Sequence, residues 1–328
     1  MLNYMNVPAS GLLVCLFLCT APLASAAVAA PPETATLTAA ATILTIALPD
    51  AEHGYYRGPR FNWGGMVTQV TWNGHTLFTE LKQPHNPLLH DHGAGACDEF
   101  GIDGALGYDQ AAAEGEFLKI GVGALRRISD KGYSFNQPFP VSRPGAWTIE
   151  TLPTEMRFVQ EFHLNARWAY RYAKTVQVSA NGFALRNELQ NLGTSAIVTD
   201  HYNHHMFAID QQPIDGSWEL LFGWDVQAKH PGPAFTLTGR TLALTGPLAS
   251  TLWTDFAWAT AATPATTNMT LSNRAAHLAV DLAIDAPPAK VALYGEPRAL
   301  CPEPFTAIHV EPGQTQTWTT TYTMRTLN

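Results

Sequence analysis

The sequence predicts an all-β chain that folds as a large antiparallel β-sandwich with few short helices. Thr and β-branched residues are abundant after residue 33, and many short segments alternate polar and apolar residues or run apolar. Gly, Pro and Asn separate these segments, and the chain has 25 Gly and 23 Pro. Helix-period segments with capping residues are nearly absent, which disfavours a parallel sheet built from strand–helix–strand units.

The strand pattern recurs along the whole chain. In chain order it is clearest at residues 41–48, 66–72, 156–164, 172–179, 183–191, 235–244, 277–284, 290–294 and 315–324. Within 235–244 a Thr-Gly-Arg turn separates two runs and predicts a hairpin. Residues 105–114 are expected to form a short helix. The Gly-rich stretch 93–108 lacks a strand–helix context, so we interpret it as a long functional loop or rim and not as a phosphate cradle.

Residues 1–26 have the features of a secretory signal peptide. The apolar run 11–19 is too short to span a bilayer as a helix, and Ala24-Ser25-Ala26 matches the small-residue cleavage pattern. Residues 1–10 contain no Lys or Arg, so a misplaced start codon or an uncleaved anchor is the alternative. The mature chain is expected to be exported, to the periplasm or the extracellular space, with no membrane association after cleavage.

We expect residues 27–39 to form a flexible segment and residues 40–328 to form a single domain, because no linker or composition break divides them. Cleavage after residue 26 leaves two cysteines, Cys97 and Cys301. In an oxidising compartment this pair could form a disulfide, or both could be unpaired core residues. The sequence leaves both alternatives open.

The composition excludes several classes of protein. Only 14% of the residues are charged and 46% are hydrophobic, whereas disordered chains have the opposite balance. The net charge of −8 has the wrong sign for a general nucleic-acid binder. The many glycines and prolines are not typical of a coiled coil.

A histidine cluster lies in the segment 199–210. On a regular strand, His204 shares a face with Tyr202 and Met206, and the adjacent His205 lies on the opposite face. One of these two histidines is therefore expected to face outward. For His201 and His205, an ordinary role as hydrogen-bonded sheet residues is the favoured interpretation.

Glu303 is the second candidate for chemistry. It lies between Pro302 and Pro304, whose rings restrict the backbone, so we expect its carboxylate to project from a stiff turn. Such a rigid group is suited to act as an acid or a base. Glu311 is in a plain turn before Pro312-Gly313 and is interpreted as solvated.

Two further clusters have alternative interpretations. Arg60 and Trp63 lie in the aromatic segment 55–75, where they could bind a sugar or simply form part of the core. His85, His90, Asp91 and His92 could ligate zinc, but their spacing matches no strong zinc signature and no metal is expected.

Taken together, these segments resemble the aldose 1-epimerase, or galactose mutarotase-like, superfamily. The strongest part is FALRNELQNLGTSAI followed by His204-His205-Met206-Phe207, which is similar to the family's Asn-Leu-Gly turn and His-x-x-Phe strand. Glu303 before Pro312-Gly313 and the last strand, and the early NWGGMVTQVTWNGH segment, also match. The resemblance covers most of residues 40–325 and implies a large antiparallel sandwich with His204 as a catalytic residue.

The chain departs from the family after the opening strands. The expected Asn-Arg-Ile or His-Gly-Phe-Ala-Arg motif is replaced by residues 98–110 and 115–127. Glu99 and Lys119 are candidate replacements there, because they are charged groups in Gly-rich surroundings, although surface or ion-pair roles are alternatives. The expected catalytic residues are His204 and Glu303, and the expected substrate-binding residues are Arg60, Trp63, Glu99, Lys119 and His201.

The resemblance implies an enzyme that interconverts sugar anomers by acid–base catalysis, with no metal or other cofactor and with a small sugar or a glycan as its partner. His204 would be the acid and Glu303 the base. Two alternatives remain open. One is a non-catalytic carbohydrate-binding protein, and the other is a hydrolase, lyase or epimerase that acts on larger glycans on the same sandwich.

Overall fold

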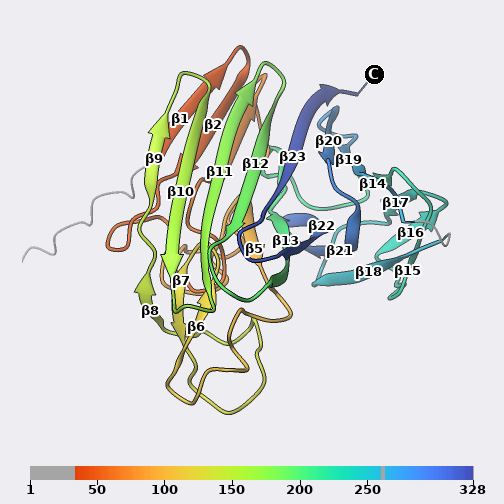
Figure 1. Cartoon of the computed structure of the whole chain (residues 1–328). Helices are drawn as coiled ribbons and strands as arrows, with labels where there is room; N and C mark the ends of the chain where they lie inside the picture. The colour runs from red at the N-terminus through yellow and green to blue at the C-terminus, as the bar shows by residue number, and fades with distance from the viewer. Residues whose placement is uncertain (1–33, 260–262, 328) are drawn as a thin grey trace, which may run out of the picture. The chain divides into compact units, whose positions relative to one another are not determined.

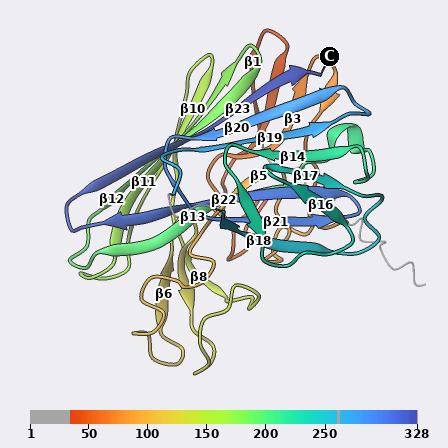
Figure 2. The same ribbon diagram turned by 90° about the vertical axis from the view of Figure 1, so that its right-hand side faces the viewer.

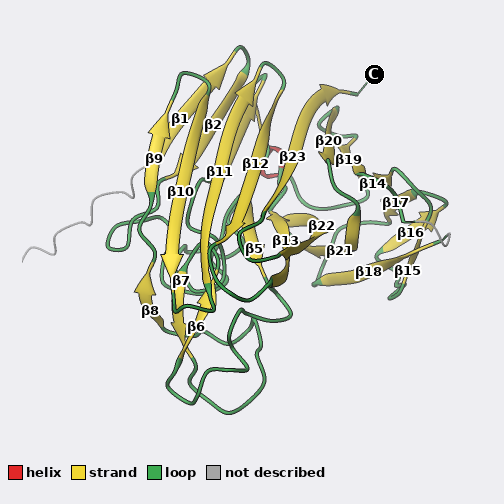
Figure 3. Cartoon of the chain, in the orientation of Figure 1, coloured by secondary structure: helices red, strands yellow, loops and turns green. Residues whose placement is uncertain are grey.

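A computed structural model describes residues 34–259 and 263–327 of the chain. Its regular structure is almost entirely β-strand (Figure 3). Within those ranges the one helical element is the short 3-10 helix η1 (Ile209–Gln211). Every strand pairing described is antiparallel, which confirms the predicted fold class. The predicted signal peptide, residues 1–26, and residues 27–33 lie outside the described residues.

Two ten-stranded sheets and one small sheet make up the structure (Figures 1 and 2). Sheet 1 has the strand order β1 (Thr34–Ala39), β2 (Thr42–Ala47), β3 (Met66–Trp72), β5 (Ala96–Phe100), β13 (Ile197–His205), β22 (Ala299–Val310), β21 (Pro288–Glu296), β18 (Leu252–Trp258) and β15 (Val226–Ala228), and β4 (His75–Thr76) pairs with β3. Its central strands β5, β13 and β22 come from three distant parts of the sequence.

Sheet 2 packs against sheet 1. Its strand order is β16 (Phe235–Thr238), β17 (Thr241–Leu244), β14 (Trp218–Phe222), β19 (Thr267–Asn273), β20 (Leu278–Ile284), β23 (Thr315–Thr326), β12 (Gly182–Asn191), β11 (Ala169–Ser179), β10 (Glu155–His163) and β9 (Thr148–Thr151). Sheet 3 consists of β6 (Glu116–Lys119), β7 (Gly123–Arg126) and β8 (Val141–Pro144). The hairpin predicted at residues 235–244 is present as β16 and β17, with Gly239 at a φ of 58° in its turn.

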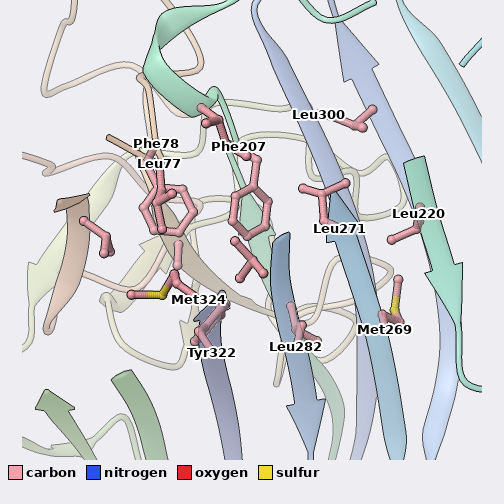
Figure 4. Packing of buried hydrophobic residues seen from close by; sticks show 14 of the residues in the cluster. Leu77, Phe78, Phe207, Leu220, Met269, Leu271, Leu282, Leu300, Tyr322 and Met324 are labelled. Carbon is pink, nitrogen blue, oxygen red and sulfur yellow. The ribbon is translucent and has the colours of Figure 1, made fainter. Parts of the chain in front are cut away.

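The largest apolar cluster fills the space between sheets 1 and 2. Phe207 and Leu300 contribute to it from the sheet 1 side, and Leu282 and Tyr322 contribute from sheet 2 (Figure 4). Each of these side chains is at most 4% exposed. Burying a large apolar side chain stabilises a fold by about 1.5–3 kcal/mol, so this layer holds the two sheets together.

Three expectations about local structure are wrong. Residues 34–39, expected in a flexible segment, form β1, because Leu37 is buried in the core and the whole segment pairs with β2. Residues 105–114 form turns and no helix, and Gly107 there has a φ of 81°, which interrupts a right-handed helix. The stretch 93–108 is not one long loop, since its middle part is β5, which is buried at all five positions.

No helix within the described residues is long and apolar enough to cross a membrane. All of the described residues belong to one compact unit, Pro32–Asn328.

Candidate active site

The two faces of the central strands of sheet 1 carry different side chains. Neighbouring side chains on a strand point to opposite faces, so Tyr202 and His204 of β13 lie on one face and His201, Asn203 and His205 lie on the other. The expectation that one of the adjacent histidines faces outward is wrong, because His204 is 4% exposed and His205 is fully buried. Sheet 2 covers the face with His201, Asn203 and His205. The face with Tyr202 and His204 is covered by loops, whose side chains form a separate apolar cluster, the loop-side core.

His204 and Glu303 meet on this loop-covered face. In the ladder between β13 and β22, Tyr202 pairs with Phe305. Continuing this register by two residues sets His204 opposite Glu303. The His204 Nδ1 and Glu303 Oε1 atoms lie 2.8 Å apart, and the two side chains are 6% and 8% exposed. The contact has the length of an ion pair, but its angles are not those of a hydrogen bond.

Glu303 belongs to strand β22, so the expectation that it projects from a turn is wrong. It pairs with Ala292 of β21, in the middle of that ladder. The β13–β22 ladder ends at Phe305, next to Pro304, because proline has no backbone N–H to donate. His205 adds a side-chain contact between the two strands, since its Nδ1 donates to the carbonyl oxygen of Pro302. The prolines therefore stiffen the strand on both sides of the carboxylate.

Aromatic rings fix the orientation of His204. Phe61 and Tyr294 both meet the imidazole edge to face, with ring centroids 6.0 Å and 5.6 Å away. Such contacts are favourable and directional. Tyr294 lies on β21, and Phe61 lies in the segment before β3. The imidazole is thus held between two walls of the site.

A buried ion cluster lies beside this pair. Glu99 Oε2 accepts from Arg60 Nε at 2.8 Å and from the Tyr202 hydroxyl at 2.6 Å. Glu99 Oε1 accepts from Lys119 Nζ at 3.1 Å. Burial alone would raise the pKa of Glu99, but the charges of Arg60 and Lys119 and the hydrogen bonds of Tyr202 and Arg60 lower it to about 2. Glu99 is therefore ionised at neutral pH, and the cluster has one positive charge more than negative charges.

Arg60 is the member of this cluster that faces open space. Its side chain is 9% exposed, and its Nη2 donates to the Tyr202 hydroxyl at 3.1 Å. Phe135 covers the guanidinium, with the ring centroid 4.7 Å from Cζ. Burial alone would lower the pKa of Arg60, but the Glu99 charge raises it further above its usual value. Arg60 therefore stays charged beside the cavity.

A cavity of about 310 Å³ joins these groups, at the lower end of the range for small-molecule pockets. Buried Arg60, Tyr202, His204 and Glu303 line its floor. Its walls and rim come from several connections and from β18 and β21, and they consist of Leu81, Lys82, Asp91, Ile102, Phe135, Asn136, Thr251, Trp253 and Tyr294.

Two of the predicted substrate-binding residues face away from the cavity. His201 lies between the sheets, where its Nδ1 accepts from Trp318 Nε1 at 3.0 Å. Burial lowers its pKa to about 4, so it is neutral at physiological pH. Trp63 is 4% exposed in the loop-side core and donates to the carbonyl oxygen of Gly58 at 2.8 Å. Glu99 and Lys119 lie behind Arg60 and do not line the cavity themselves.

A second polar cluster lies between the sheets, on the opposite face of β5. Asp98 accepts from Lys174 Nζ at 2.6 Å and from Asn62 Nδ2 at 2.9 Å, and Asn203 donates to its other oxygen. His205 is held nearby, with its Nε2 accepting from the Tyr322 hydroxyl at 2.7 Å. Burial lowers the pKa of His205 to about 4. These groups link sheet 1 to sheet 2.

The cysteines and the loop histidines have local roles. Cys97 and Cys301 are both free and buried, which matches the alternative of unpaired core residues. His85 stacks on Tyr55 at 4.0 Å, and His92 Nδ1 accepts from the backbone N–H of Asn86. In residues 34–259 and 263–327, no group of three or more His, Cys, Asp or Glu side chains converges as a metal site.

The chain was compared with known protein families, curated proteins and solved structures. No protein-family model matches the chain, and no curated protein matches it. Solved structures do match. The Slr1438 protein of Synechocystis sp. PCC 6803 is 16% identical, with a TM-score of 0.58 over 91% of this chain and 99% of that one. The GalM/aldose epimerase homologue of C. elegans is 12% identical, with a TM-score of 0.57 over 90% and 100%.

A third solved structure with the same fold is described as galactose mutarotase-like. A galactose mutarotase-like protein of Clostridium acetobutylicum is 11% identical, with a TM-score of 0.56 over 90% of this chain and 96% of that one. The chain has the galactose mutarotase-like fold. The fold that the resemblance implied is thereby confirmed. In this fold, the described site lies on the central strands of sheet 1.

Several residues of the cavity escaped the sequence analysis. Tyr202 was placed on the face of His204, but its contact with Glu99 was not foreseen. Tyr294 lies in the predicted strand 290–294 but was not singled out, and Trp253 lies outside the predicted strands. Phe135 and Asn136 belong to the connection between β7 and β8, where no pattern marks a ligand contact. The alternation of side chains along 290–294 could have pointed to Tyr294, but only with the neighbouring strands known.

Proposed function

We propose that this protein is a carbohydrate-active enzyme of the aldose 1-epimerase type, which interconverts the anomers of a sugar. The observation that carries this proposal is the contact between His204 and Glu303 on the cavity floor. The neighbours with the same fold include proteins named as aldose epimerase homologues and galactose mutarotase-like proteins. Their likeness supports the general class of activity, and the residues of this chain supply the mechanism.

Ring opening requires one proton to leave and one to arrive. The anomeric hydroxyl and the ring oxygen are bonded to the same carbon, so the groups that act on them must approach from neighbouring positions. The His204–Glu303 pair, as imidazolium and carboxylate, offers an acid and a base side by side. Glu303 takes the proton of the anomeric hydroxyl while His204 gives a proton to the ring oxygen. The bond between C1 and the ring oxygen breaks, and its electrons remain on that oxygen.

Ring closure reverses these roles. The product of opening is the open-chain aldehyde, with a neutral imidazole and a carboxylic acid beside it. After rotation about the C1–C2 bond, imidazole takes the proton of the hydroxyl that attacks C1. The carboxylic acid returns its proton to the former carbonyl oxygen. The other anomer is formed, the two side chains regain their starting protonation, and there is no net oxidation or reduction.

The remaining floor residues would hold the sugar. Arg60 can donate hydrogen bonds to hydroxyl groups from a position fixed by Glu99 and Tyr202. A prepositioned donor costs little entropy when a ligand binds. Glu99 acts behind Arg60 as a positioning residue, 2.8 Å from its Nε, and Lys119 in turn holds Glu99 at 3.1 Å.

We propose that the enzyme acts outside the cytoplasm. The support is the sequence of residues 1–26, with its short apolar run and small-residue cleavage site. N-terminal sequencing of the protein recovered from cell fractions tests this. A mature chain that begins after residue 26 in the periplasmic or culture fraction is the expected result, and an intact N-terminus in the cytoplasmic fraction would contradict it.

The direct test of the function is anomer exchange followed by NMR with freshly dissolved α-glucose, α-galactose, other aldoses and uronic acids. The purified mature protein should speed the approach to equilibrium for at least one sugar. His204→Ala and Glu303→Gln should each lower kcat about 10²–10⁴-fold, because each removes a positioned proton-transfer group. The fold should persist, as judged by circular dichroism.

A matched control is available on the protein surface. His309 and Glu311 form a similar pair, with His309 Nε2 and Glu311 Oε1 2.9 Å apart, but both are more than 60% exposed and far from the cavity lining. His309→Ala and Glu311→Gln should leave turnover unchanged. If the wild-type protein binds a sugar without speeding exchange, the non-catalytic binding alternative replaces the proposal.

A further inference from the structure

Trp253 is an unusual residue at the rim of the cavity. It is 51% exposed, and it is the only aromatic ring among the large exposed apolar side chains of residues 34–259 and 263–327. Burying such a side chain would stabilise the fold, so its exposure calls for an explanation beyond folding. The side chain also lines the cavity that holds His204 and Glu303.

The strand register fixes where Trp253 lies relative to the reacting pair. Along β18, Leu252, Thr254 and Phe256 are buried, and Trp253 lies on the opposite face. Trp253 pairs with Tyr294 of β21, whose ring meets the imidazole of His204. Glu303 lies on the next strand, so Trp253 is two strands from it, or about 10 Å across the sheet. This spacing across the sheet is larger than the width of a single pyranose ring.

The surroundings of Trp253 hold it in place and offer polar partners. The ring of His230 packs against it, with centroids 4.9 Å apart. Thr251 and Asn136, both exposed, are polar residues of the same cavity lining. A supported aromatic face with hydroxyl and amide groups nearby is typical of sugar sites, because the CH face of a sugar stacks on the ring and its hydroxyls bond to the polar groups.

We propose that Trp253 is the platform for a second sugar ring, so that the cavity takes the reducing end of an oligosaccharide in preference to a free hexose. The proposal rests on the proposed function, since it assigns the reacting ring to His204 and Glu303. The next ring of the glycan extends over Tyr294 to Trp253. Trp253 at the rim then determines which sugars are preferred, whereas His204 and Glu303 on the floor carry out the proton transfers.

The experiment compares two sugars that react at the same type of ring. α-Glucose and α-lactose both undergo anomer exchange at glucose, and lactose carries one additional ring. NMR of freshly dissolved sugar gives kcat/KM for each. We expect the wild-type protein to favour lactose. Trp253→Ala should lower kcat/KM for lactose about tenfold more than for glucose, which corresponds to the loss of one aromatic stacking contact.

Two variants control this result. Trp253→Phe keeps an aromatic face and should recover a large part of the preference for lactose. Val198→Ala removes an exposed apolar side chain, 63% exposed, from β13 at a point outside the cavity lining. It should leave both values unchanged. Saturation-transfer NMR on His204→Ala measures binding of the two sugars independently of turnover.

The outcomes separate this proposal from the proposed function. If glucose is turned over and lactose is not favoured, or if Trp253→Ala affects both sugars equally, the platform is overturned and the epimerase activity stands. If no sugar of the anomer-exchange panel is turned over but lactose binds in a Trp253-dependent way, the platform stands and the activity is overturned. The absence of turnover with every sugar of that panel, together with the absence of Trp253-dependent binding, overturns the two together.

Discussion

Asp98 and Glu99 are neighbours on β5, and each is a buried carboxylate in contact with a lysine, yet they serve different parts of the molecule. Asp98 faces sheet 2, and Lys174 is its one Lys or Arg partner among the described residues. Glu99 faces the loops and contacts two cations, Lys119 and Arg60. We call Asp98–Lys174 the closed pair, because its two charges cancel. We call Glu99, Lys119 and Arg60 the open cluster, because one positive charge is left over beside the cavity. The same chemistry therefore links the two sheets on one face of the strand and holds the charged Arg60 beside the cavity on the other.

The largest effect is expected from breaking the closed pair. Lys174→Met leaves Asp98 buried with amide donors and no cation, and breaking a buried pair from one side costs about 3–5 kcal/mol. Urea unfolding should show this loss of unfolding free energy. Arg325→Met is the control, because its pair with Asp281 is 49% and 39% exposed and should contribute under about 1 kcal/mol. Equal losses in the two variants would contradict the distinction.

Breaking the open cluster should affect binding more than stability. Arg60→Met removes one cation, but Glu99 keeps Lys119 and the Tyr202 hydroxyl as partners. The unfolding free energy should therefore fall by less than in Lys174→Met. Hydrogen bonds from charged groups contribute about 1.5–3 kcal/mol, so kcat/KM for the sugar should fall roughly 10–100-fold.

Arg60→Lys sharpens the same test. Lysine is a point charge without the fork that reaches both Glu99 and Tyr202, so it should restore stability but only part of the sugar affinity. Full recovery of kcat/KM in this variant would show that charge alone matters at this position.

A further expected effect concerns pH and again divides the two faces. The pKa values of His201 and His205, between the sheets, are lowered to about 4 by burial, below the unfolded value near 6.5. Their contribution is complete above pH 6.5 and is lost as the pH falls toward 4, at about 1.4 kcal/mol per pH unit for each. Glu99, with its pKa lowered to about 2, adds a loss only below its usual range near 4.5.

Urea unfolding at pH 7, 6 and 5 measures this slope. His205→Gln should reduce it, because glutamine does not titrate and can still bond to Pro302 or Tyr322. A slope identical to that of the wild-type protein would mean that other groups cause the acid sensitivity.

Local sequence patterns were enough to predict the fold class and most strands. Alternation and β-branched runs are properties of neighbouring residues, so segments such as 66–72 and 315–324 were identified almost to their ends. β5 was missed because its sequence, ACDEF, has two acidic residues beside glycines. Burial of those acids depends on Lys174 and Lys119, which are distant in the sequence and carry no local signal.

The site was predicted in its central pair and missed at its edges. His204 and Glu303 were identified from the family resemblance and from residue chemistry, and strand register brings them together. Trp63 and His201 were expected at the substrate, but Trp63 packs in the loop-side core. His201 lies on the face of β13 opposite to His204, as the alternation of that strand implies. The rim residues come from separate connections, whose folded paths no periodic pattern describes.

The division of the cavity between strands and connections has a consequence for how such proteins change over evolutionary time. The floor residues Tyr202, His204 and Glu303 lie on central strands of sheet 1, which are packed on both faces, so a shift in any of them disturbs the packing of many others. Phe135, Asn136 and Thr251 lie on connections and can be replaced one at a time. The lining of the rim can therefore change by single substitutions at little cost to stability, whereas the floor is constrained by the packing of the sandwich.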